Sequence, residues 1–484
     1  MILSITITCI LFLAPILRGS WDLWAQTLIH MATLGGALLW FSFKILTGTF
    51  PVHDHAYRKK LWSLAALAAA SIYFSPLYGV SAVHGLNVFN GLFLLWALPL
   101  MRQEQRRQID KALHMMVWIL LVLSVQQRWE APAQAYEHFP PSTLVTANAY
   151  AGFLVMAVPL SYLWNDVVLL AGLLAALWWT GSVGAWLSLS CALILYFLFR
   201  RKKILFWVGL SVGALCLLSA LDKLTGDSLA HRWHWWLAAG RMSLARPLLG
   251  FGPGTFAYLL PAFKVLSPEK GMGSLYAHQA VLEWAAEWGL PATALWLSFV
   301  AAAARNLNKA RKVALLAGLI HSLGDFTLSI PSNFWLFCYL VAYTQPESSE
   351  HVNIPGPRKP WLLAGALCAG VFISGFIVAP WRAQRKLVKA REIYSETRDL
   401  PRALSLLQEA ARLAPRQPDA YLLMAQLTPD FQRKLDWQAR GARLNPYRPK
   451  SWKDLADLQK HLGQTEQARE TLRQARRYIP WLTE

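Results

Sequence analysis

Residues 361–379 read WLLAGALCAGVFISGFIVA, and this stretch decides the fold class. It contains no charged side chain, and about 20 apolar residues in a helix are enough to cross roughly 30 Å of hydrocarbon. A segment exposed to lipid must satisfy its backbone polar groups internally, which an α-helix does. The stretch therefore predicts a transmembrane helix.

Similar apolar runs precede it along most of the chain. Of the 484 residues, 55% are hydrophobic and only 15% are charged, whereas a soluble domain carries about 25% charged residues. We therefore predict an all-α fold, a polytopic transmembrane helix bundle of about thirteen spans. The expected spans lie near residues 2–17, 23–46, 61–78, 85–101, 112–125, 149–164, 167–181, 183–199, 204–220, 283–304, 312–326, 332–344 and 361–379.

Much of the net charge of +20 lies in short loops between these runs, and the C-terminal tail is also basic. Such clusters mark cytoplasmic loops of inner-membrane proteins, and they predict that segments 126–147, 221–280 and 326–331 lie outside. A nucleic-acid binder would instead present one basic face with a reading element, so no nucleic-acid partner is expected. The clusters are Arg58 to Lys60, Arg102 to Lys111, Arg200 to Lys203 and Arg305 to Lys312.

The five cysteines all lie inside apolar runs and lack metal-ligand spacing, so they indicate neither a metal site nor a disulfide framework. The first run lacks a basic leader segment and a small-residue cleavage site. We interpret it as a retained span.

The composition changes beyond residue 384, where Ala, Leu, Gln, Arg and Glu dominate. Alanine-rich segments end at Pro415, Pro446 and Pro480, close to the 34-residue period of tetratricopeptide repeats. We predict a membrane domain over 1–382 and helical repeats over 383–484, with a simple helical hairpin as the alternative. Thirteen spans place this tail outside, an even number would reverse it, and a protein partner is possible for it.

The predicted outer segment 221–280 combines arginines, tryptophans and a glycine-rich turn. Guanidinium groups bind phosphate oxygens bidentately, and aromatic faces pack on sugar rings or lie at the headgroup level. The turn Pro-Leu-Leu-Gly-Phe-Gly-Pro-Gly (247–254) lacks the lysine of a phosphate-binding loop. Alone it indicates only a turn with positive-φ glycines.

His278 follows this turn at a predicted membrane edge. Imidazole can transfer a proton near neutral pH, although a lone histidine is more often a packing residue. Its context is His278-Gln279-x-x-Leu282-x4-Glu287-x-Gly289, which resembles the signature of the O-antigen ligase and polymerase superfamily. Other elements similar to that family occur in its order: Asn148 at the start of a span, Arg232 with Trp236, the glycine turn, and His321 with Asp325.

This resemblance implies a metal-independent glycosyltransferase that needs no cofactor. Its donor would be a glycan on undecaprenyl diphosphate, and its acceptor a hydroxyl on a lipid or protein. By position, Arg232 would hold the diphosphate and His278 would orient or deprotonate the acceptor hydroxyl. Further substrate-binding candidates are Asn148, Arg241, Gly252, Gly254 and Gln279.

One position departs from the family pattern. A second functional arginine usually occurs before the large loop, but Val183 stands there. Arg241, Arg128 or Lys264 could supply the cation, or the site is degenerate. We expect Asp325 and His321, four residues apart on one helical face, to form a structural hydrogen bond or ion pair. Glu287 is expected to pack the bundle.

Three enzymatic functions fit this pattern: an O-antigen ligase, a surface-polysaccharide polymerase and an O-linked protein oligosaccharyltransferase. A ligase is the first choice. A non-catalytic scaffold for glycan assembly or export is the alternative of another class, and the missing arginine favours it. Arg232 and His278 facing one cavity would support an enzyme.

Overall fold

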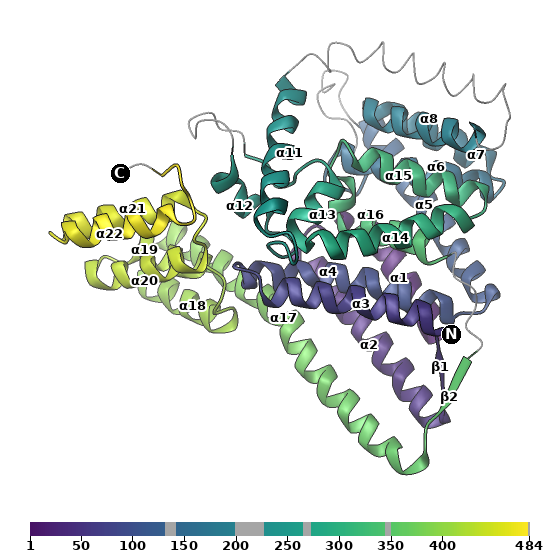
Figure 1. Ribbon diagram of the computed structural model, residues 1–484, viewed down its shortest axis with the longest axis horizontal. Coiled ribbons are helices and arrows are strands. Elements are labelled where there is room, and N and C mark those ends of the chain that lie inside the picture. The colour runs from purple at the N-terminus through teal and green to yellow at the C-terminus, as the bar shows by residue number, and fades with distance from the viewer. Residues whose placement is uncertain (131–141, 199–226, 265–272, 344–349, 483–484) are drawn as a thin grey trace.

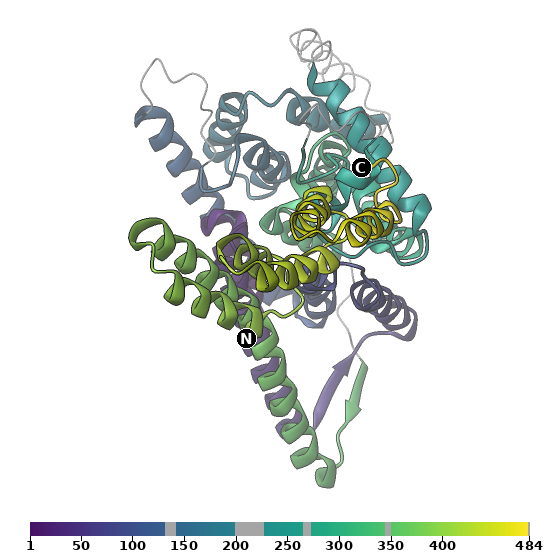
Figure 2. The same cartoon turned by 90° about the vertical axis from the view of Figure 1, so that its left-hand side faces the viewer.

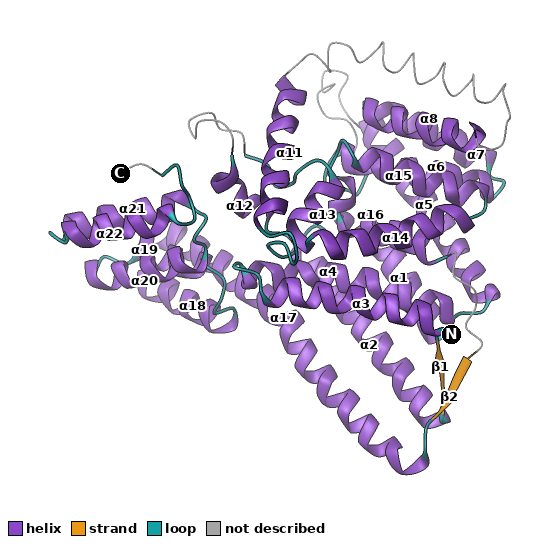
Figure 3. Ribbon diagram, viewed as in Figure 1, coloured by secondary structure: helices purple, strands orange, loops and turns teal. Residues whose placement is uncertain are grey.

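The computed structural model describes residues 1–130, 142–198, 227–264, 273–343 and 350–482. Helices make up nearly all of this part of the chain, together with one pair of short strands (Figures 1 and 3). The predicted all-α fold class is confirmed. The only β-structure among the described residues is the antiparallel pair β1 (Thr49–Val52) and β2 (Glu350–Asn353), which the sequence had not indicated.

The membrane body is a bundle of helices of unequal length. Its first half comprises α1 (Ile2–Ile16), η1 (Arg18–Ser20), α2 (Leu23–Thr47), α3 (His55–Tyr73), α4 (Tyr78–Ala97), η2 (Leu98–Leu100), α5 (Gln103–Glu130), α6 (Ala147–Leu163), α7 (Val167–Trp179) and α8 (Val183–Leu198). The second half comprises α11 (Asp227–Ala245), α12 (Phe256–Phe263), α13 (Ala280–Trp288), α14 (Leu290–Asn306), α15 (Lys309–Ser322), η3 (Thr327–Ser329), α16 (Pro331–Ala342), η4 (Gly356–Arg358) and α17 (Lys359–Thr397).

Four stretches of helix in the described residues are long and apolar enough to cross a membrane. They are Leu23–Thr47, Tyr78–Leu100, Gln103–Glu130 and Gly356–Thr397. Shorter apolar helices, α1 and α6 to α8, coincide with other predicted spans. The predicted span 204–220 lies outside the described residues, so the count of thirteen stays a prediction.

Two predicted boundaries were wrong. The spans expected at 61–78 and 85–101 are α3 and α4, but the break between them lies between Tyr73 and Tyr78 and not at 79–84. Pro76 lies in this break, and proline disfavours helix continuation through its missing N–H and its ring. The single span expected at 283–304 is two helices, α13 and α14. They are divided at Gly289, whose φ of 84° is not helical. Apolar composition continues through both breaks, so it could not locate them.

A buried polar cluster connects three helices of the body. Arg311 of α15 forms an ion pair with Asp110 of α5, and Tyr339 of α16 donates its hydroxyl to the same carboxylate at 2.8 Å. A buried charge is costly unless it is paired and hydrogen-bonded. This cluster therefore fixes the relative positions of α5, α15 and α16.

Helix α17 lies beside α2, and both project from the body in the two ribbon views (Figures 1 and 2). Gly370 packs against Leu38, where the missing side chain permits close approach. Much of the apolar half of α17 is exposed, including Trp361 at 81% and Phe372 at 78%. Such a surface suits contact with lipid.

The tail forms a series of helices, each packed on the next: α18 (Leu400–Leu413), α19 (Asp419–Leu427), α20 (Phe431–Leu444), α21 (Pro449–His461) and α22 (Thr465–Arg476). Pro415, Pro446 and Pro480 follow the ends of α18, α20 and α22, so each closes a helix pair. The tetratricopeptide class of these pairs stays a prediction. The proposed domain boundary at 382/383 falls inside α17, which continues from the body into the tail.

The tail contacts the body through residues that the sequence did not indicate. Trp481 donates its indole N–H to the carbonyl of Pro261 at 2.9 Å. The guanidinium of Arg416 lies 4.4 Å from the ring centre of Tyr78. The tail therefore packs on α12 and on the start of α4, at the end of the body opposite β1 and β2 (Figure 1).

Candidate active site

Arg232 of α11 is directed at the loop that follows α15. Its Nη1 donates to the carbonyl of Gly324 at 2.8 Å, and its Nη2 lies 3.7 Å from Oδ2 of Asp325. The Asp325 side chain is 8% exposed, whereas that of Arg232 is 29% exposed. A guanidinium has five donors, so Arg232 can hold this loop and still present N–H groups to an anion.

His278 meets the same carboxylate from the other side. Its Nδ1 lies 3.9 Å from Oδ1 of Asp325. The imidazole stacks on Trp235 at 4.8 Å and meets the edge of Phe326 at 5.0 Å. The structure thus brings His278 and Arg232 together around Asp325.

The backbone of His278 is held in an unusual conformation. Its φ of 55° lies in the left-handed region, which is uncommon for residues other than glycine. Trp236 donates its indole N–H to the His278 carbonyl at 3.3 Å, and Gln279 caps α13 by accepting the N–H of Leu282 at 2.5 Å. Such strained conformations persist only when surrounding contacts hold them, and they are common at active sites.

The protonation state of His278 follows from its surroundings. Burial lowers its pKa from 6.5 to about 4; Asp325 opposes this change and Arg232 adds to it. The imidazole is therefore neutral near pH 7. A neutral imidazole can accept a proton, as a general base must.

Two glutamates of α13 hold the loops on either side of this cluster. Glu287 accepts the N–H groups of Gly254 at 2.8 Å and Phe256 at 3.0 Å. Glu283 accepts the N–H of Ala277 at 2.7 Å and the hydroxyl of Ser329 at 2.6 Å. Both side chains are buried. Glu287, expected to pack the bundle, in fact binds a loop, and the role of Glu283 was missed.

The glycine turn lies against the break between α13 and α14. Gly252 donates its N–H to the carbonyl of Glu287 at 2.7 Å, and Leu290 donates to Pro247 at 2.7 Å. The N–H groups of Gly252 and Gly254, proposed to bind substrate, are thus used within the protein. Their substrate-binding role stays a prediction without geometric support.

Residues 167–297 match the O-antigen ligase family model. The match supports the O-antigen ligase superfamily and a glycosyltransferase-type function in polysaccharide assembly. Together with the apolar helices, it indicates a multi-pass membrane protein. Searches of curated proteins and of solved structures give no match.

The O-antigen ligase match contains Arg232 and His278 but ends before Asp325. We expected Asp325 and His321 to share a helical face, which was wrong because α15 ends at Ser322. His321 instead pairs through Nδ1 with the hydroxyl of Thr327 at 2.7 Å. Asp325 thus lies in a loop, where its carboxylate faces both proposed catalytic residues.

The remaining candidates from the sequence, Gln279, Arg241 and Asn148, take different positions in the structure. Gln279 is adjacent to His278 and caps α13. Arg241 is exposed, nine residues beyond Arg232 on α11, which places it on the opposite side of that helix. Asn148 lies in the first turn of α6, outside the matched segment, and is partly buried.

The position at which the family pattern has a second arginine lies at the start of α8. Val183 is the first residue of that helix, and its neighbour Gly184 lies beside His321. Lys264, one proposed substitute, lines a cleft with tail residues such as Arg448. The geometry therefore gives Lys264 a place at the tail rather than at His278.

Proposed function

We propose that this chain is a membrane glycosyltransferase of the O-antigen ligase type. It transfers a glycan from undecaprenyl diphosphate to an acceptor hydroxyl on the outer face of the inner membrane. The observation that carries the proposal is the meeting of Arg232 and His278 at Asp325, with ion-pair distances of 3.7 and 3.9 Å. Both residues lie in the segment that matches the O-antigen ligase family.

The reaction follows from the positions of these groups. Because Nδ1 of His278 faces Asp325, Nε2 is the ring atom left for substrate. Nε2 removes the proton of the acceptor hydroxyl while its oxygen attacks the anomeric carbon of the donor sugar. The bond from that carbon to the diphosphate oxygen breaks, and Arg232 stabilises the charge that develops on the departing diphosphate.

The outer face is proposed from the arrangement of charge. The basic clusters at residues 58–60 and 305–312 predict cytoplasmic loops. Because Arg232 and His278 both lie in the segment 221–280, which is predicted to be outside, the diphosphate would be released there. The tail packs on α12 near the same loops, which supports an extracytoplasmic tail.

The convergence of these three side chains distinguishes an enzyme from a scaffold. A non-catalytic scaffold would not require an arginine, a histidine and a carboxylate to converge, so the observed geometry favours an enzyme. A polymerase or a protein oligosaccharyltransferase would use the same three groups. The polymerase and the oligosaccharyltransferase differ from a ligase only in the acceptor. The three enzymes are therefore distinguished by their products.

The test is complementation of a deletion strain with His278→Ala and Arg232→Ala. Loss of a general base typically lowers the rate by about 10²–10⁴, so the surface glycan ladder should disappear at normal protein level. His55→Ala and Arg102→Ala, at exposed positions on the predicted cytoplasmic side, are matched controls that should retain it.

The pattern of loss identifies the acceptor reaction. Accumulated lipid-linked glycan without attachment supports a ligase, and shortened chains support a polymerase. Loss of glycan from a protein alone supports an oligosaccharyltransferase. Wild-type ladders in both variants would contradict catalysis at these residues and favour the scaffold.

A further inference from the structure

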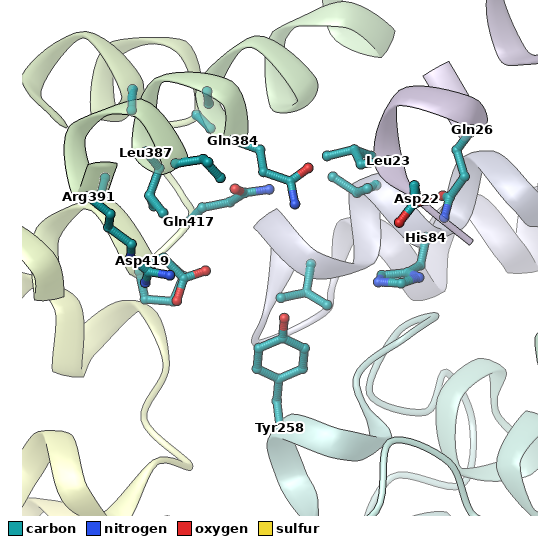
Figure 4. A pocket seen from close by; sticks show the side chains of 18 of the residues that line it. Asp22, Leu23, Gln26, His84, Tyr258, Gln384, Leu387, Arg391, Gln417 and Asp419 are labelled. Atoms are coloured by element: carbon teal, nitrogen blue, oxygen red, sulfur yellow. The ribbon is translucent and has the colours of Figure 1, made fainter. Parts of the chain in front are cut away.

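A cleft of about 520 Å³ lies between the tail and the membrane body (Figure 4). One wall comes from α17 and the tail, with Gln384, Arg391 and Gln417. The other comes from the start of α2 and from α4, with Asp22 and His84. Its volume is within the range of roughly 300–1,000 Å³ that is usual for ligand sites.

Several polar side chains that line this cleft make no hydrogen bond to another described residue. Within the described residues, the side chains of Gln384 and Gln417 and the hydroxyl of Tyr258 form no hydrogen bond. Figure 4 shows the two amides and the Tyr258 hydroxyl directed toward the space between the walls. Each amide carries two donors and an acceptor, and the hydroxyl can both donate and accept a hydrogen bond. They could therefore bind a ligand rich in hydroxyl groups.

The charge of the lining opposes an anionic ligand. Its charged side chains are Asp22, Arg391 and Asp419, which sum to a formal charge of −1. A diphosphate needs an excess of cations, which this cleft lacks. Trp21 and Tyr258 add aromatic surface to the lining, and aromatic rings pack well on apolar faces of sugars. The combination fits an uncharged oligosaccharide.

The lining of the cleft is connected to the active site by contacts between aromatic side chains: Trp21 meets the ring of Tyr276 at 5.8 Å. Trp21, His84 and Tyr258 also line a second cavity of about 210 Å³, which reaches Tyr276. The Tyr276 ring stacks on Phe326 at 5.3 Å, and Phe326 contacts His278 at 5.0 Å. The cleft therefore lies a short row of packed aromatic rings away from the proposed general base.

We propose that this cleft binds the oligosaccharide portion of the acceptor. The naming of the ligand as acceptor rests on the proposed function; the binding of an oligosaccharide does not. The tail then supplies half of a substrate site. Sugar units held by Gln384, Gln417 and Tyr258 orient the attacking hydroxyl toward His278.

The test measures binding to full-length protein in detergent micelles. The probe is short oligosaccharide released by mild acid from the surface glycan of the source cells, free of lipid and diphosphate. Wild-type protein should bind it, and inorganic phosphate should not compete. The double variant Gln384→Ala/Gln417→Ala should bind about tenfold more weakly, because each amide contributes at least one hydrogen bond.

Three further variants separate this proposal from the proposed function. Tyr258→Phe removes only the hydroxyl and should weaken binding severalfold, whereas exposed Gln467→Ala in the tail should not. His278→Ala should bind as wild type does while transfer is lost. If His278→Ala kept transfer, the proposed function would fail while the glycan site stood. Absence of oligosaccharide binding by wild type, or unchanged binding by the well-folded double variant, would overturn the inference.

Discussion

Oδ1 of Asp325 lies 3.9 Å from Nδ1 of His278, and the second oxygen of the same carboxylate faces Arg232. The Asp325 side chain is only 8% exposed and faces both proposed catalytic groups, so we assign it as a positioning residue. In Asp325→Asn, the amide oxygen can still accept the Phe326 N–H that Oδ1 now accepts at 2.7 Å. The loop should therefore fold.

We expect Asp325→Asn to reduce kcat about tenfold or more, with little change in KM, because it removes an anion that favours the imidazolium formed during proton transfer. Rates are measured with purified enzyme and lipid-linked donor. Asp325→Glu, which restores the charge, should recover part of the activity. Equal rates for Asp325→Asn and wild type would exclude a role for this carboxylate.

The pH dependence of transfer should report the state of His278. Only the neutral imidazole accepts a proton, and burial lowers its pKa to about 4. Activity limited by this group should therefore be nearly constant from pH 7 down to about 5 and reach half of its plateau near pH 4. The measurement is kcat/KM against pH in micelles. An acid limb near pH 6.5, the ordinary histidine value, would show that His278 is not the base.

The same change in pKa has a consequence for stability. An unfolded chain protonates this histidine below about pH 6.5, whereas the folded chain does so only near pH 4. Folding therefore loses stability as the pH falls from 6.5 to 4, by about 3 kcal/mol in total. Thermal unfolding of wild type and of His278→Gln over this range checks the sign: the variant should depend less on pH.

Glu287→Gln should destabilise the loop that contains the glycine turn. The glutamate accepts two N–H groups, and an amide can replace only one of its oxygens. The other N–H would face an NH2 group in a buried site, at a cost of about 1–3 kcal/mol. Thermal unfolding in micelles measures the loss. Glu466→Gln in the tail, whose side chain is 79% exposed, is the matched control and should change little.

The sequence predicted the features that depend on patterns of neighbouring residues, namely the helices and the motif around His278. Apolar runs located most helices, and the spacing around His278 together with Arg232 identified two residues that do converge. The partners of Glu287 are 31 and 33 residues away in sequence, and those of Asp325 come from α11 and the loop before α13. Such pairings depend on how helices pack, which periodicity does not encode.

The tail shows the same limit. Its prolines and alanines predicted helix pairs, and α18 to α22 form them. The contacts of Trp481 with Pro261 and of Arg416 with Tyr78 join segments more than 200 residues apart. The cleft that these contacts create has no sequence motif, because its two walls each contribute isolated polar residues.

A last prediction concerns the break between α13 and α14. A Cβ on Gly289 would lie 2.4 Å from the carbonyl oxygen of Leu248, and one on Gly250 would lie 2.4 Å from that of Glu287. Both glycines also have positive φ. We expect Gly289→Ala to separate the glycine turn from α13, and so to displace the loop from Glu287.

The measurable result is a lower melting temperature and loss of transfer in Gly289→Ala, even though His278 and Arg232 are unchanged. Gly240→Ala is the matched control, because Gly240 lies inside α11 with nothing within 4 Å of its added Cβ. Alanine is favoured over glycine in a helix by about 1 kcal/mol, so this variant should be as stable as wild type or more so. If Gly289→Ala melted and transferred like Gly240→Ala, the close backbone contact between the turn and α13 would not be what positions the active site.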